Sequence, residues 1–460
     1  MTLKAFTDTI AAISTPIGVG GVAIVRISGS QACFIATRLT QKTDFSPNKI
    51  VFSKFINSNR QIIDEGLVSY FRSPNSYTGE DVIEINCHGG YVIAQAILEQ
   101  VMVYGARMAT KGEFTLRAFI NGKLDLLQAE AVIDLIDAKT FQSSQVSVSQ
   151  LEGQLSLAIK EIRTKLLHLI AHLEVHLDYP EEEDLSPQEN YVQNIQNLIT
   201  EIDAVLNTFN TGRLLKDGVL TIIAGKPNVG KSSLLNSLLR DDRAIVSHIA
   251  GTTRDTIEEW MQIDGLPFKL IDTAGIRQSS DDIEIIGINK AKEYLTKAEI
   301  VLVLLDASTG LEPDDMSIIK SIQKSKIIFI INKIDILPNN EKEILAFLKE
   351  DFSQNIIIST SLMEKESIHG IEDKLVYFVK NVLLTAKEEV CLLNNERQKE
   401  QLVSAKDCLE KAQQSVLQGL SEDFWLIDLK QALSNLSEVI GENVSEEILE
   451  NIFSRFCVGK

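Results

Sequence analysis

The stretch of sequence that decides the fold is Gly225-Lys-Pro-Asn-Val-Gly-Lys-Ser232, which fits the pattern GxxxxGK[ST]. The apolar run VLTIIA (219–224) predicts a strand before it, and SSLLNSLL (232–239) predicts a helix after it. In that setting, backbone N–H groups of the loop and of the helix N-terminus bind phosphate oxygens. Lys231 would contact the β- and γ-phosphates, and Ser232 would ligate magnesium. The competing interpretation is a glycine-rich turn with no ligand.

Three further motifs follow in order, each at the end of a predicted strand. They are Asp272-Thr-Ala-Gly275 after FKLI, Asn332-Lys-Ile-Asp335 after KIIFII, and Ser359 after NIII. Asp272 suits a carboxylate near magnesium, and the N–H of Gly275 can reach the γ-phosphate. A carboxylate at Asp335 accepts hydrogen bonds from the ring N–H and the exocyclic amine of guanine, so it selects GTP over ATP. The motifs together predict a GTPase domain.

The last of these motifs has an ambiguous register. Ser359 lies where such proteins close the base pocket with backbone groups, but Thr360 and Ser361 follow it directly. The residue that closes the pocket is therefore open among these three.

The hydrolytic chemistry departs from that of many Ras-like proteins, which place a water-orienting Gln directly after DxxG. Here Ile276 occupies that position and cannot orient water, so we expect a polar group from 277–284 to do so. Asn228 offers a side-chain oxygen near the β–γ bridge, and a monovalent cation held there could supply the charge that an arginine finger brings. The alternatives are an ordinary turn residue at Asn228 and an arginine finger from Arg254 or Arg277.

A polar segment, Gly251-Thr-Thr-Arg-Asp255, lies between these motifs. Thr253 within it is the natural second magnesium ligand of a switch segment.

The chain divides by texture into several parts. VAIVRI, GLVSYF and DVIEINC read as strands near the N-terminus, and 91–105 reads as a helix closed by Gly105. Helical periodicity follows, as at Leu166, Leu167, Ile170, Leu173 and Leu177. We expect a multidomain α/β plus α fold in four parts: an N-terminal α/β domain at 1–123, a helical part at 124–217, an inserted Ras-like P-loop G domain with a parallel sheet at 218–381, and a second helical part at 382–460. The two helical parts would together form a bundle, because neither buries its apolar stripe alone.

Composition excludes several classes of protein. The 460 residues are 44% hydrophobic and 24% charged, which suits about three globular units at ~150 residues each. With 45 basic and 64 acidic residues, the net charge of −19 argues against a protein that grips nucleic acid by bulk charge. Only residues 1–123, with 12 basic and 9 acidic side chains, could meet a polyanion without strong repulsion. The alternative is chance variation in surface charge.

Compartment and membrane signals are also informative. No apolar run approaches the ~18 residues of a membrane span, and the N-terminus lacks the pattern of a signal or transit peptide. The five cysteines are scattered and contain no CxxC pair, which excludes a disulfide framework and favours a reducing cytoplasm. His168, His172 and His176 share one helix face and could suggest zinc, but an exposed helix face is the preferred interpretation.

The motifs resemble, over nearly the full length, those of the MnmE (TrmE) family of tRNA-modifying GTPases. The resemblance is carried by GKPNVGKSS, GTTRD, DTAGIR and NKID, by DTIAAISTPIGVGGVAIVRISG, PNSYTGEDVIEINCHGG and KGEFTLRAFINGKLDLLQAEAVIDLIDA, and by the terminal FCVGK. Two segments depart from the family pattern. Thr15-Pro-Ile-Gly-Val-Gly-Gly21 replaces TPPGRGG, so a basic residue is absent at Val19, and Val458 replaces Ile or Leu in the tail.

The resemblance implies a set of ligand-binding residues. Potassium would be held by Asn228, the carbonyls of Ser247 and Ile249, and Thr252, and magnesium by Ser232 and Thr253. Glu284 would orient the attacking water, and Cys457 would lie near the modification site. Tetrahydrofolate, in the 5-formyl or methylene form, would contact Arg26, Glu84, Lys123 and Lys460. The nucleotide contacts expected overall are Gly225, Asn228, Val229, Gly230, Lys231, Ser232, Ser233, Ser247, Ile249, Thr252, Thr253, Asp272, Thr273, Ala274, Gly275, Asn332, Lys333, Asp335, Ser359 and Thr360.

The resemblance also implies a function. The N-terminal domain would bind folate and form a homodimer, and potassium would drive G-domain association and GTP hydrolysis. With the flavoprotein MnmG, the family installs an aminomethyl or carboxymethylaminomethyl group on the wobble uridine of tRNA. The alternatives are a ribosome-assembly GTPase without modification chemistry, and an N-terminal dimerisation module whose folate pocket is vestigial.

Overall fold

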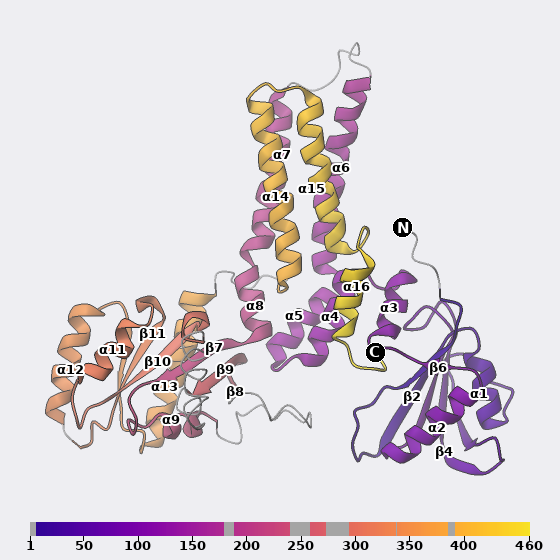
Figure 1. Cartoon of the computed structure of the whole chain (residues 1–460), viewed down its shortest axis with the longest axis horizontal. Helices are drawn as coiled ribbons and strands as arrows, with labels where there is room; N and C mark the ends of the chain where they lie inside the picture. The colour runs from indigo at the N-terminus through magenta and orange to yellow at the C-terminus, as the bar shows by residue number, and fades with distance from the viewer. Residues whose placement is uncertain (1–5, 179–187, 240–257, 273–293, 337, 385–391) are drawn as a thin grey trace, which may run out of the picture. The chain divides into compact units, whose positions relative to one another are not determined.

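The computed structural model describes residues 6–178, 188–239, 258–272, 294–336, 338–384 and 392–460. The chain forms two compact units (Figure 1). The first comprises Met1–Ile136, Gln150–Ile202 and Glu400–Lys460, and the second comprises Asp137–Ser149 and Asp203–Lys399.

The first unit contains a six-stranded sheet in the order β3-β4-β5-β2-β1-β6, antiparallel except where β1 pairs with β6. Its strands are β1 (Ile10–Ile13), β2 (Val22–Ser28), β3 (Ile50–Ile56), β4 (Ile62–Phe71), β5 (Val82–His88) and β6 (Arg107–Met108). Burial alternates along the central strands: Val25 and Ile85 are buried in a core that includes Ile35 of α1 (Ala32–Thr40) and Ile97 of α2 (Tyr91–Val103). The residues between them, Arg26 and Glu84, belong to the opposite face of the sheet.

The C-terminus of the chain returns to this sheet. Three helices, α3 (Glu113–Ile120), α4 (Leu126–Asp137) and α16 (Glu446–Ser454), pack through an apolar cluster that includes Leu126, Leu449 and Phe453. Beyond α16, the backbone of Val458 forms an antiparallel bridge with Lys111. The last residues are therefore attached to the segment between β6 and α3 of the N-terminal domain, although they lie at the far end of the sequence.

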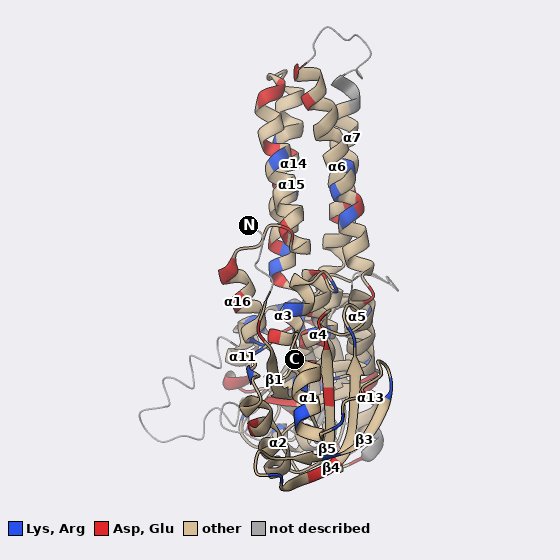
Figure 2. Cartoon of the chain, turned by 90° about the vertical axis from the view of Figure 1, so that its right-hand side faces the viewer, with Lys and Arg blue, Asp and Glu red and all other residues tan. Residues whose placement is uncertain are grey.

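The helical stretches predicted from periodicity form an upright bundle of four long helices (Figure 1). They are α6 (Gln154–Asp178), α7 (Gln188–Asn207), α14 (Glu396–Leu417) and α15 (Glu422–Ile440). Leu166, Ile170 and Leu173 are buried, and the rings of Tyr191 and Trp425 meet edge-on at 5.1 Å. Leu167 is 45% exposed and does not belong to the buried stripe. Charges of both signs are interspersed along the outer faces, which is ordinary for solvated helices (Figure 2).

The second unit is built on the other six-stranded sheet, in the order β12-β11-β10-β7-β9-β8. Its strands are β7 (Val219–Ala224), β8 (Glu258–Ile263), β9 (Leu266–Asp272), β10 (Ile300–Asp306), β11 (Ile327–Asn332) and β12 (Ile356–Ser359). All pairs are parallel except β8–β9. The sequence did not reveal β8, because only Met261 and Ile263 of this polar edge strand are buried.

Helices surround this sheet and extend the unit beyond 218–381. They are α5 (Phe141–Leu151, shared between the units), α8 (Phe209–Asp217), α9 (Lys231–Leu238), α11 (Pro313–Lys320), α12 (Pro338–Asp351) and α13 (Lys365–Phe378), with single turns at η2 (Lys324–Lys326) and η3 (Val379–Leu383). Arg213 of α8 forms an ion pair of 2.9 Å with Glu299, and the N–H of Leu393 donates to Thr208 Oγ1 at 3.0 Å. The first bond attaches α8 to the start of β10, and the second joins the segments that precede α8 and α14. No helix in the described ranges is both long and apolar enough to cross a bilayer.

Candidate functional site

The phosphate loop joins β7 to α9 and requires glycine at both ends. Gly225 (φ +151°) and Gly230 (φ +106°) both have positive φ values. A Cβ at Gly225 would lie 2.7 Å from the oxygen of Leu304, and one at Gly230 would lie 2.6 Å from Nδ2 of Asn332. The loop therefore lies directly against the ends of β10 and β11, with no room for side chains at these two points.

Lys231 provides a cation within the curve of this loop. The residue is 8% exposed, and its Nζ donates to the carbonyl oxygens of Gly225 at 2.9 Å and Lys226 at 2.6 Å. Its charge is thus held inside the curve of the loop, beside the N-terminus of α9. That is where an anion such as a nucleotide phosphate is stabilised by both the lysine and the helix N–H groups.

The NKID motif is bonded directly to the phosphate loop. Nδ2 of Asn332 donates to the oxygen of Val229 at 2.8 Å, and Nζ of Lys333 donates to the oxygen of Asn228 at 2.9 Å. Asn332 also accepts, through Oδ1, a bond of 3.1 Å from the N–H of Leu362. Asn332 thus joins the phosphate loop to the segment after β12, and these sequence-predicted motifs do meet at one sheet edge.

The three residues among which the base-closing position is open lie at the end of β12. Ser359 closes β12 and pairs with Ile331, whereas Thr360 is 3% exposed and Ser361 is 4% exposed. Oγ1 of Thr360 has no hydrogen-bond partner within the described part of the chain. The hydrogen bond to Asn332 is donated by the backbone N–H of Leu362. The sequence could not predict this bond, because an apolar side chain gives no indication of what its backbone N–H contacts. Asp335 is exposed.

Asp306, the last residue of β10, is a member of this site that the sequence analysis missed. Its Oδ2 lies 2.6 Å from Nζ of Lys333, and its Oδ1 accepts bonds from the N–H and the hydroxyl of Ser308. Burial alone would raise the pKa of Asp306, but the bonds from Lys333 and Ser308 lower it overall. The available signal was its place at the end of an apolar strand, the position also held by Asp272 and Asn332.

Several predicted residues fall beyond what the structure describes. Asp272 ends β9 opposite Ile223 of β7, so its backbone lies next to the start of the phosphate loop, but its side chain is not among the described parts. The others that lie outside the described residues are Ser247, Ile249, Thr252, Thr253, Thr273, Ala274, Gly275 and Glu284. Ser232 and Ser233 are exposed at the start of α9.

A second cluster of sequence-predicted residues lies on the N-terminal sheet. Arg26 of β2 and Glu84 of β5 are directly opposite in the register, and Nε and Nη2 of Arg26 both lie 2.9 Å from Oε1 of Glu84. In the described part of the chain, no bond reaches Oε2 of Glu84, so it remains available to a ligand. The guanidinium carbon of Arg26 lies 5.7 Å from the ring centres of both Tyr77 and Phe114.

The C-terminal tail completes this cluster. Nη1 of Arg26 donates to the oxygen of Gly459 at 3.2 Å, and the hydroxyl of Ser14 donates to the same oxygen at 3.2 Å. The oxygen of Lys460 accepts from the N–H of Phe114 at 3.2 Å. Burial, followed by the charge of Arg26, lowers the pKa of Lys460, while Glu84 opposes the shift. Arg26, Glu84 and Lys460 are therefore neighbours.

The two other residues predicted for this site, Lys123 and Cys457, are both exposed. Lys123 is exposed, and its side chain packs close to Gly79, whose Cβ would lie 3.2 Å from Cγ of Lys123. Cys457 is an exposed free thiol in the tail. Tyr77 and Phe114 were not predicted, although both occur in the motifs PNSYTGED and KGEFTLRAF. Their contact with Arg26 depends on ring stacking, which sequence spacing does not show.

A network of charges ties β1, β6 and α3 together within the same sheet domain. Arg117 is fully buried and forms ion pairs with Asp8, Glu80 and Glu113. Arg107 forms a second pair with Glu113 at 2.6 Å. Since α3 begins at Glu113 and its Phe114 contacts both Arg26 and Lys460, this network fixes the helix that supports the cluster.

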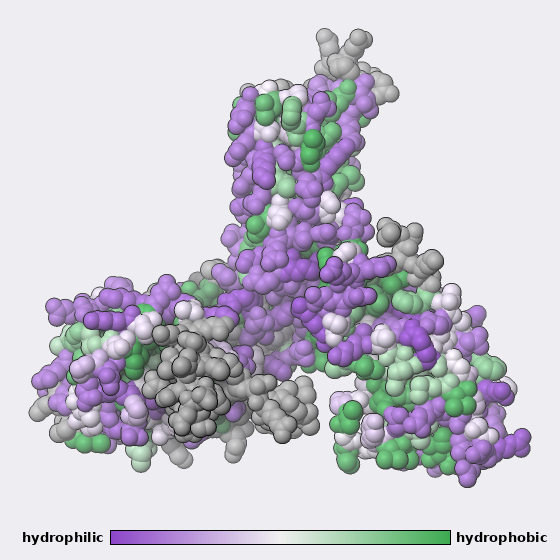
Figure 3. All heavy atoms as spheres, in the orientation of Figure 1, coloured by the Kyte–Doolittle hydropathy of each residue, from purple (hydrophilic) through white to green (hydrophobic). Residues whose placement is uncertain are grey.

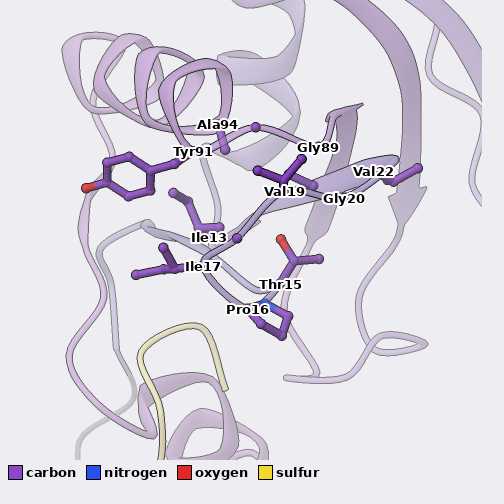
Figure 4. A pocket seen from close by; sticks show the side chains of 13 residues that line it. Ile13, Thr15, Pro16, Ile17, Val19, Gly20, Val22, Gly89, Tyr91 and Ala94 are labelled. Carbon is purple, nitrogen blue, oxygen red and sulfur yellow. The ribbon is translucent and has the colours of Figure 1, made fainter. Parts of the chain in front are cut away.

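A pocket of about 260 Å³ opens beside the loop between β1 and β2 (Figure 4). Ile17, Val19 and Tyr91 line it, and these side chains are 82%, 103% and 52% exposed. Hydrophobic surface gathers on this domain in the space-filling view (Figure 3). The loop that departs from the family pattern at Val19 is thus apolar and open.

The histidines of α6 show no metal-like arrangement. Nδ1 of His176 lies 2.7 Å from Oε2 of Glu422 at the start of α15, so this histidine joins two bundle helices. Across the described ranges, no group of three or more His, Cys, Asp or Glu is placed to hold a metal ion.

Two protein families match nearly the whole chain. The family described as "MnmE helical domain" matches residues 126–457, and the family described as "GTP-binding protein TrmE N-terminus" matches residues 9–123. Among solved structures, the G domain of the T. maritima FeoB iron transporter matches 35% of this chain and 98% of its own at 26% identity. Its TM-score of 0.26 is below the level at which we infer a shared fold.

Full-length relatives are much closer. The tRNA modification GTPases MnmE of Alkaliphilus metalliredigens, Carboxydothermus hydrogenoformans and Acetivibrio thermocellus are 41%, 42% and 44% identical to this chain. Each alignment covers 98% of this chain and 99% of the relative. Both the family matches and the full-length identity thus lead to one conclusion: the chain belongs to the MnmE family of tRNA modification GTPases.

Proposed function

We propose that this protein is a potassium-dependent GTPase that acts with MnmG on the wobble uridine of tRNA. It installs an aminomethyl or carboxymethylaminomethyl group, using a one-carbon unit carried by tetrahydrofolate, and it works in the cytoplasm as a homodimer joined through its N-terminal domain. Family membership supports GTP hydrolysis in tRNA modification. The four-part division at 1–123, 124–217, 218–381 and 382–460 is part of the same proposal.

The nucleotide half of the proposal assigns GTP to the phosphate loop and the NKID motif. Lys231 holds the β- and γ-phosphates, and Ser232, with Thr253 from outside the described residues, offers hydroxyl oxygens of the kind that magnesium prefers. Asp335 is exposed and accepts from the guanine edge. Glu284 orients the attacking water, because Ile276 cannot.

Asn228 supplies the cation site. It is exposed at φ +62°, and no bond to its side-chain oxygen occurs in the described part of the chain, while its carbonyl is occupied by Lys333. A side-chain amide oxygen is a suitable ligand for a potassium ion, with Ser247, Ile249 and Thr252 as the other ligands. The bound ion supplies positive charge at the β–γ bridge, the role that an arginine finger has in other GTPases.

The folate half assigns tetrahydrofolate to the cluster around Arg26. Oε2 of Glu84 is available to accept from the donor edge of a pterin, and Arg26, Lys460 and the exposed Lys123 offer cations to the anionic glutamate tail. The residues present therefore fit the group. Cys457, exposed one turn from Lys460 in the tail, would lie near the site of modification.

One observation carries the proposal: the tail bearing Cys457 and Lys460 is bonded to Arg26, in the same chain that holds a GTP-type phosphate loop. Mass spectrometry of tRNA nucleosides from a deletion strain tests it. Complementation with the wild type should restore the modified wobble uridine, and complementation with Glu84→Gln should not. Full restoration by the Glu84 variant, with no measurable tetrahydrofolate binding by the wild type, would favour a vestigial pocket.

Hydrolysis tests the cation. GTP turnover should be much faster in KCl than in NaCl, and Glu284→Ala should lower turnover while leaving GTP affinity nearly unchanged, as expected for a group that acts in the transition state. Equal rates and unchanged G-domain association in the two salts would reject the potassium role. Loss of GTP binding in the Glu284 variant would make that residue structural.

The ribosome-assembly alternative predicts a different deletion phenotype. Ribosomal subunit profiles would change while the wobble uridine stayed modified. The net charge of −19 and the acidic helical flanks disfavour this class, which binds ribosomal RNA through basic domains.

A further inference from the structure

Lys226, the second residue of the phosphate loop, forms ion pairs that the functions assigned above do not use. Its Nζ lies 2.9 Å from Oε2 of Glu312 and 2.8 Å from Oδ2 of Asp315, both at the start of α11. Lys226 is 9% exposed and Asp315 is 1% exposed. A lysine in this loop therefore joins the nucleotide-binding turn to a neighbouring helix through a largely buried contact.

The two carboxylates are held by the helix itself. Glu312 is the N-cap of α11, and its side chain accepts from the backbone of Asp315, while Oδ2 of Asp315 accepts from the N–H of Glu312 at 3.0 Å. Oδ1 of Asp315 has no hydrogen-bond partner among the residues described. The buried carboxylate of Asp315 thus depends on Lys226 for its counter-charge, since removing one partner of a buried pair is strongly destabilising.

Lys226 remains a cation in this setting. Burial alone would lower its pKa, but the bonds and charges of Asp315 and Glu312 outweigh burial and raise it. The attachment therefore persists across the physiological pH range.

A second attachment holds the same loop two residues further on. The oxygen of Asn228 accepts from Lys333, and Lys333 is in turn bonded to Asp306. Asp306 begins the β10–α11 segment, and Glu312 ends it. Residues 226–228 are thus fixed at both ends to one connecting segment of the sheet.

This double attachment coincides with an unfavourable backbone conformation. Asn228 has φ +62°, in the left-handed region, which costs a residue with a Cβ about 1 kcal/mol and persists only where neighbouring contacts impose it. The bonds of Lys226 and Lys333 therefore leave residues 226–228 little freedom to relax from that conformation.

We infer that Lys226 is a positioning residue for GTP hydrolysis: its ion pairs with Glu312 and Asp315 hold residues 226–228 so that Asn228 presents its side-chain oxygen at the β–γ bridge. This inference rests on the proposed cation role of Asn228. The ammonium of Lys226 is bonded to Glu312 and Asp315, so Lys226 acts through the loop backbone. A change in Lys226 should therefore affect the reaction step and cation binding more than GTP binding.

The test compares Lys226→Gln with Lys226→Arg in the full-length protein. For Lys226→Gln we expect kcat to fall about tenfold and the potassium concentration for half-activation to rise about tenfold. The Kd of a non-hydrolysable GTP analogue, measured by calorimetry, should stay within about threefold of the wild type in NaCl and lose the tightening that KCl gives the wild type. Arginine, whose guanidinium can bond both carboxylates, should restore most of kcat. The matched control is Lys269→Gln, which removes a partly buried ion pair of 2.8 Å with Glu258 in the same domain. It should leave kcat and potassium activation unchanged.

The outcomes separate positioning from stability. All rates are measured well below the thermal midpoint of each variant, so that each is folded. A folded Lys226→Gln protein with wild-type kcat and wild-type potassium activation overturns the inference, even if its thermal midpoint is lower. If Lys226→Gln does not fold, Glu312→Gln is measured in its place. Glu312 is half exposed, and the substitution removes only one ion pair. An unchanged kcat and an unchanged potassium concentration for half-activation in Glu312→Gln would overturn the inference.

The proposed cation role can fail separately. If wild-type hydrolysis is equal in KCl and NaCl, the role of Asn228 is wrong and this inference fails with it. If the wild type is activated by potassium but Lys226→Gln is activated in the same way, only the inference fails.

Discussion

Nη1 of Arg26 donates a hydrogen bond of 3.2 Å to the backbone oxygen of Gly459, a residue 433 positions later in the chain. The bond brings the last residues of the protein to the Arg26–Glu84 pair on the N-terminal sheet. Gly459 is buried at φ +100°, in the left-handed region that favours glycine. The tail therefore fits its place only with glycine at this position.

Gly459→Ala should weaken folate binding. A Cβ at this position would lie 2.4 Å from the oxygen of Ile13, so the tail must move away from Arg26. We expect the affinity for 5-formyl-tetrahydrofolate, measured by calorimetry, to fall about tenfold, which is about 1.4 kcal/mol. Val458→Ala is the control, since Val458 meets Lys111 through its backbone. Wild-type affinity in Gly459→Ala would show that the tail does not form part of the site.

Asn228→Gly should abolish activation by potassium. Glycine adopts φ +62° without strain and keeps the carbonyl that Lys333 bonds, so the change removes only the side-chain oxygen. We expect kcat in KCl to fall about a hundredfold, as for loss of one group that stabilises transition-state charge. In NaCl, the variant and the wild type should hydrolyse GTP at the same slow rate. A variant still stimulated by potassium would mean that the ion binds elsewhere.

Asp335→Asn should change the base preference. In the proposed site the carboxylate accepts two guanine N–H groups. A hydrogen bond to a charged group contributes about 1.5–3 kcal/mol, so GTP affinity should fall at least about tenfold. An amide can donate to the oxygen that xanthine carries in place of the amine, so the variant should bind XTP better than the wild type does. Competition binding with GTP and XTP measures this. Asp351→Asn, at the end of α12, is the control, and an unchanged ratio of affinities would exclude Asp335 from base recognition.

Unfolding of the N-terminal sheet should depend on pH through Glu113. Its carboxylate is buried and accepts bonds from Arg107 at 2.6 and 2.8 Å, Arg117 at 2.9 Å and the N–H of Thr110 at 2.9 Å. Burial acts to raise the pKa of Glu113, but these bonds outweigh it and lower the pKa from 4.5 to about 2. The difference corresponds to about 3 kcal/mol of folding free energy.

Because the pKa of Glu113 is lowered in the folded protein, its contribution is complete above the ordinary value of 4.5 and is lost as the pH falls toward 2. Hydrogen exchange of α3 amides in urea, at a series of acidic pH values, should show this loss in the wild type. Glu113→Gln should be less stable at neutral pH and show a flatter response to acid. Glu99→Gln, an exposed change on α2, should keep the wild-type slope. An equally steep response in Glu113→Gln would assign the effect to another carboxyl.

The sequence by itself determined the nucleotide-binding architecture. Gly225–Ser232, Asp272 and Asn332–Asp335 are short contiguous motifs that each follow an apolar run, and parallel strands bring such ends to one edge of a sheet. Helical periodicity likewise predicted the long helices of the bundle. The periodicity wrongly included Leu167 in the buried stripe, since this residue is exposed. The antiparallel strand β8 was not predicted, because a polar edge strand carries few apolar residues.

The tertiary structure alone decided which side chains serve these motifs. The bonds from Lys226 to Asp315, from Lys333 to Asp306 and from Arg26 to Gly459 join residues far apart in the chain. From the sequence, a charged side chain is predicted to be exposed to solvent, because the surrounding sequence does not show whether an oppositely charged residue from a distant segment lies beside it. Burial beside an opposite charge gives it a specific role, and burial is a property of the packed chain.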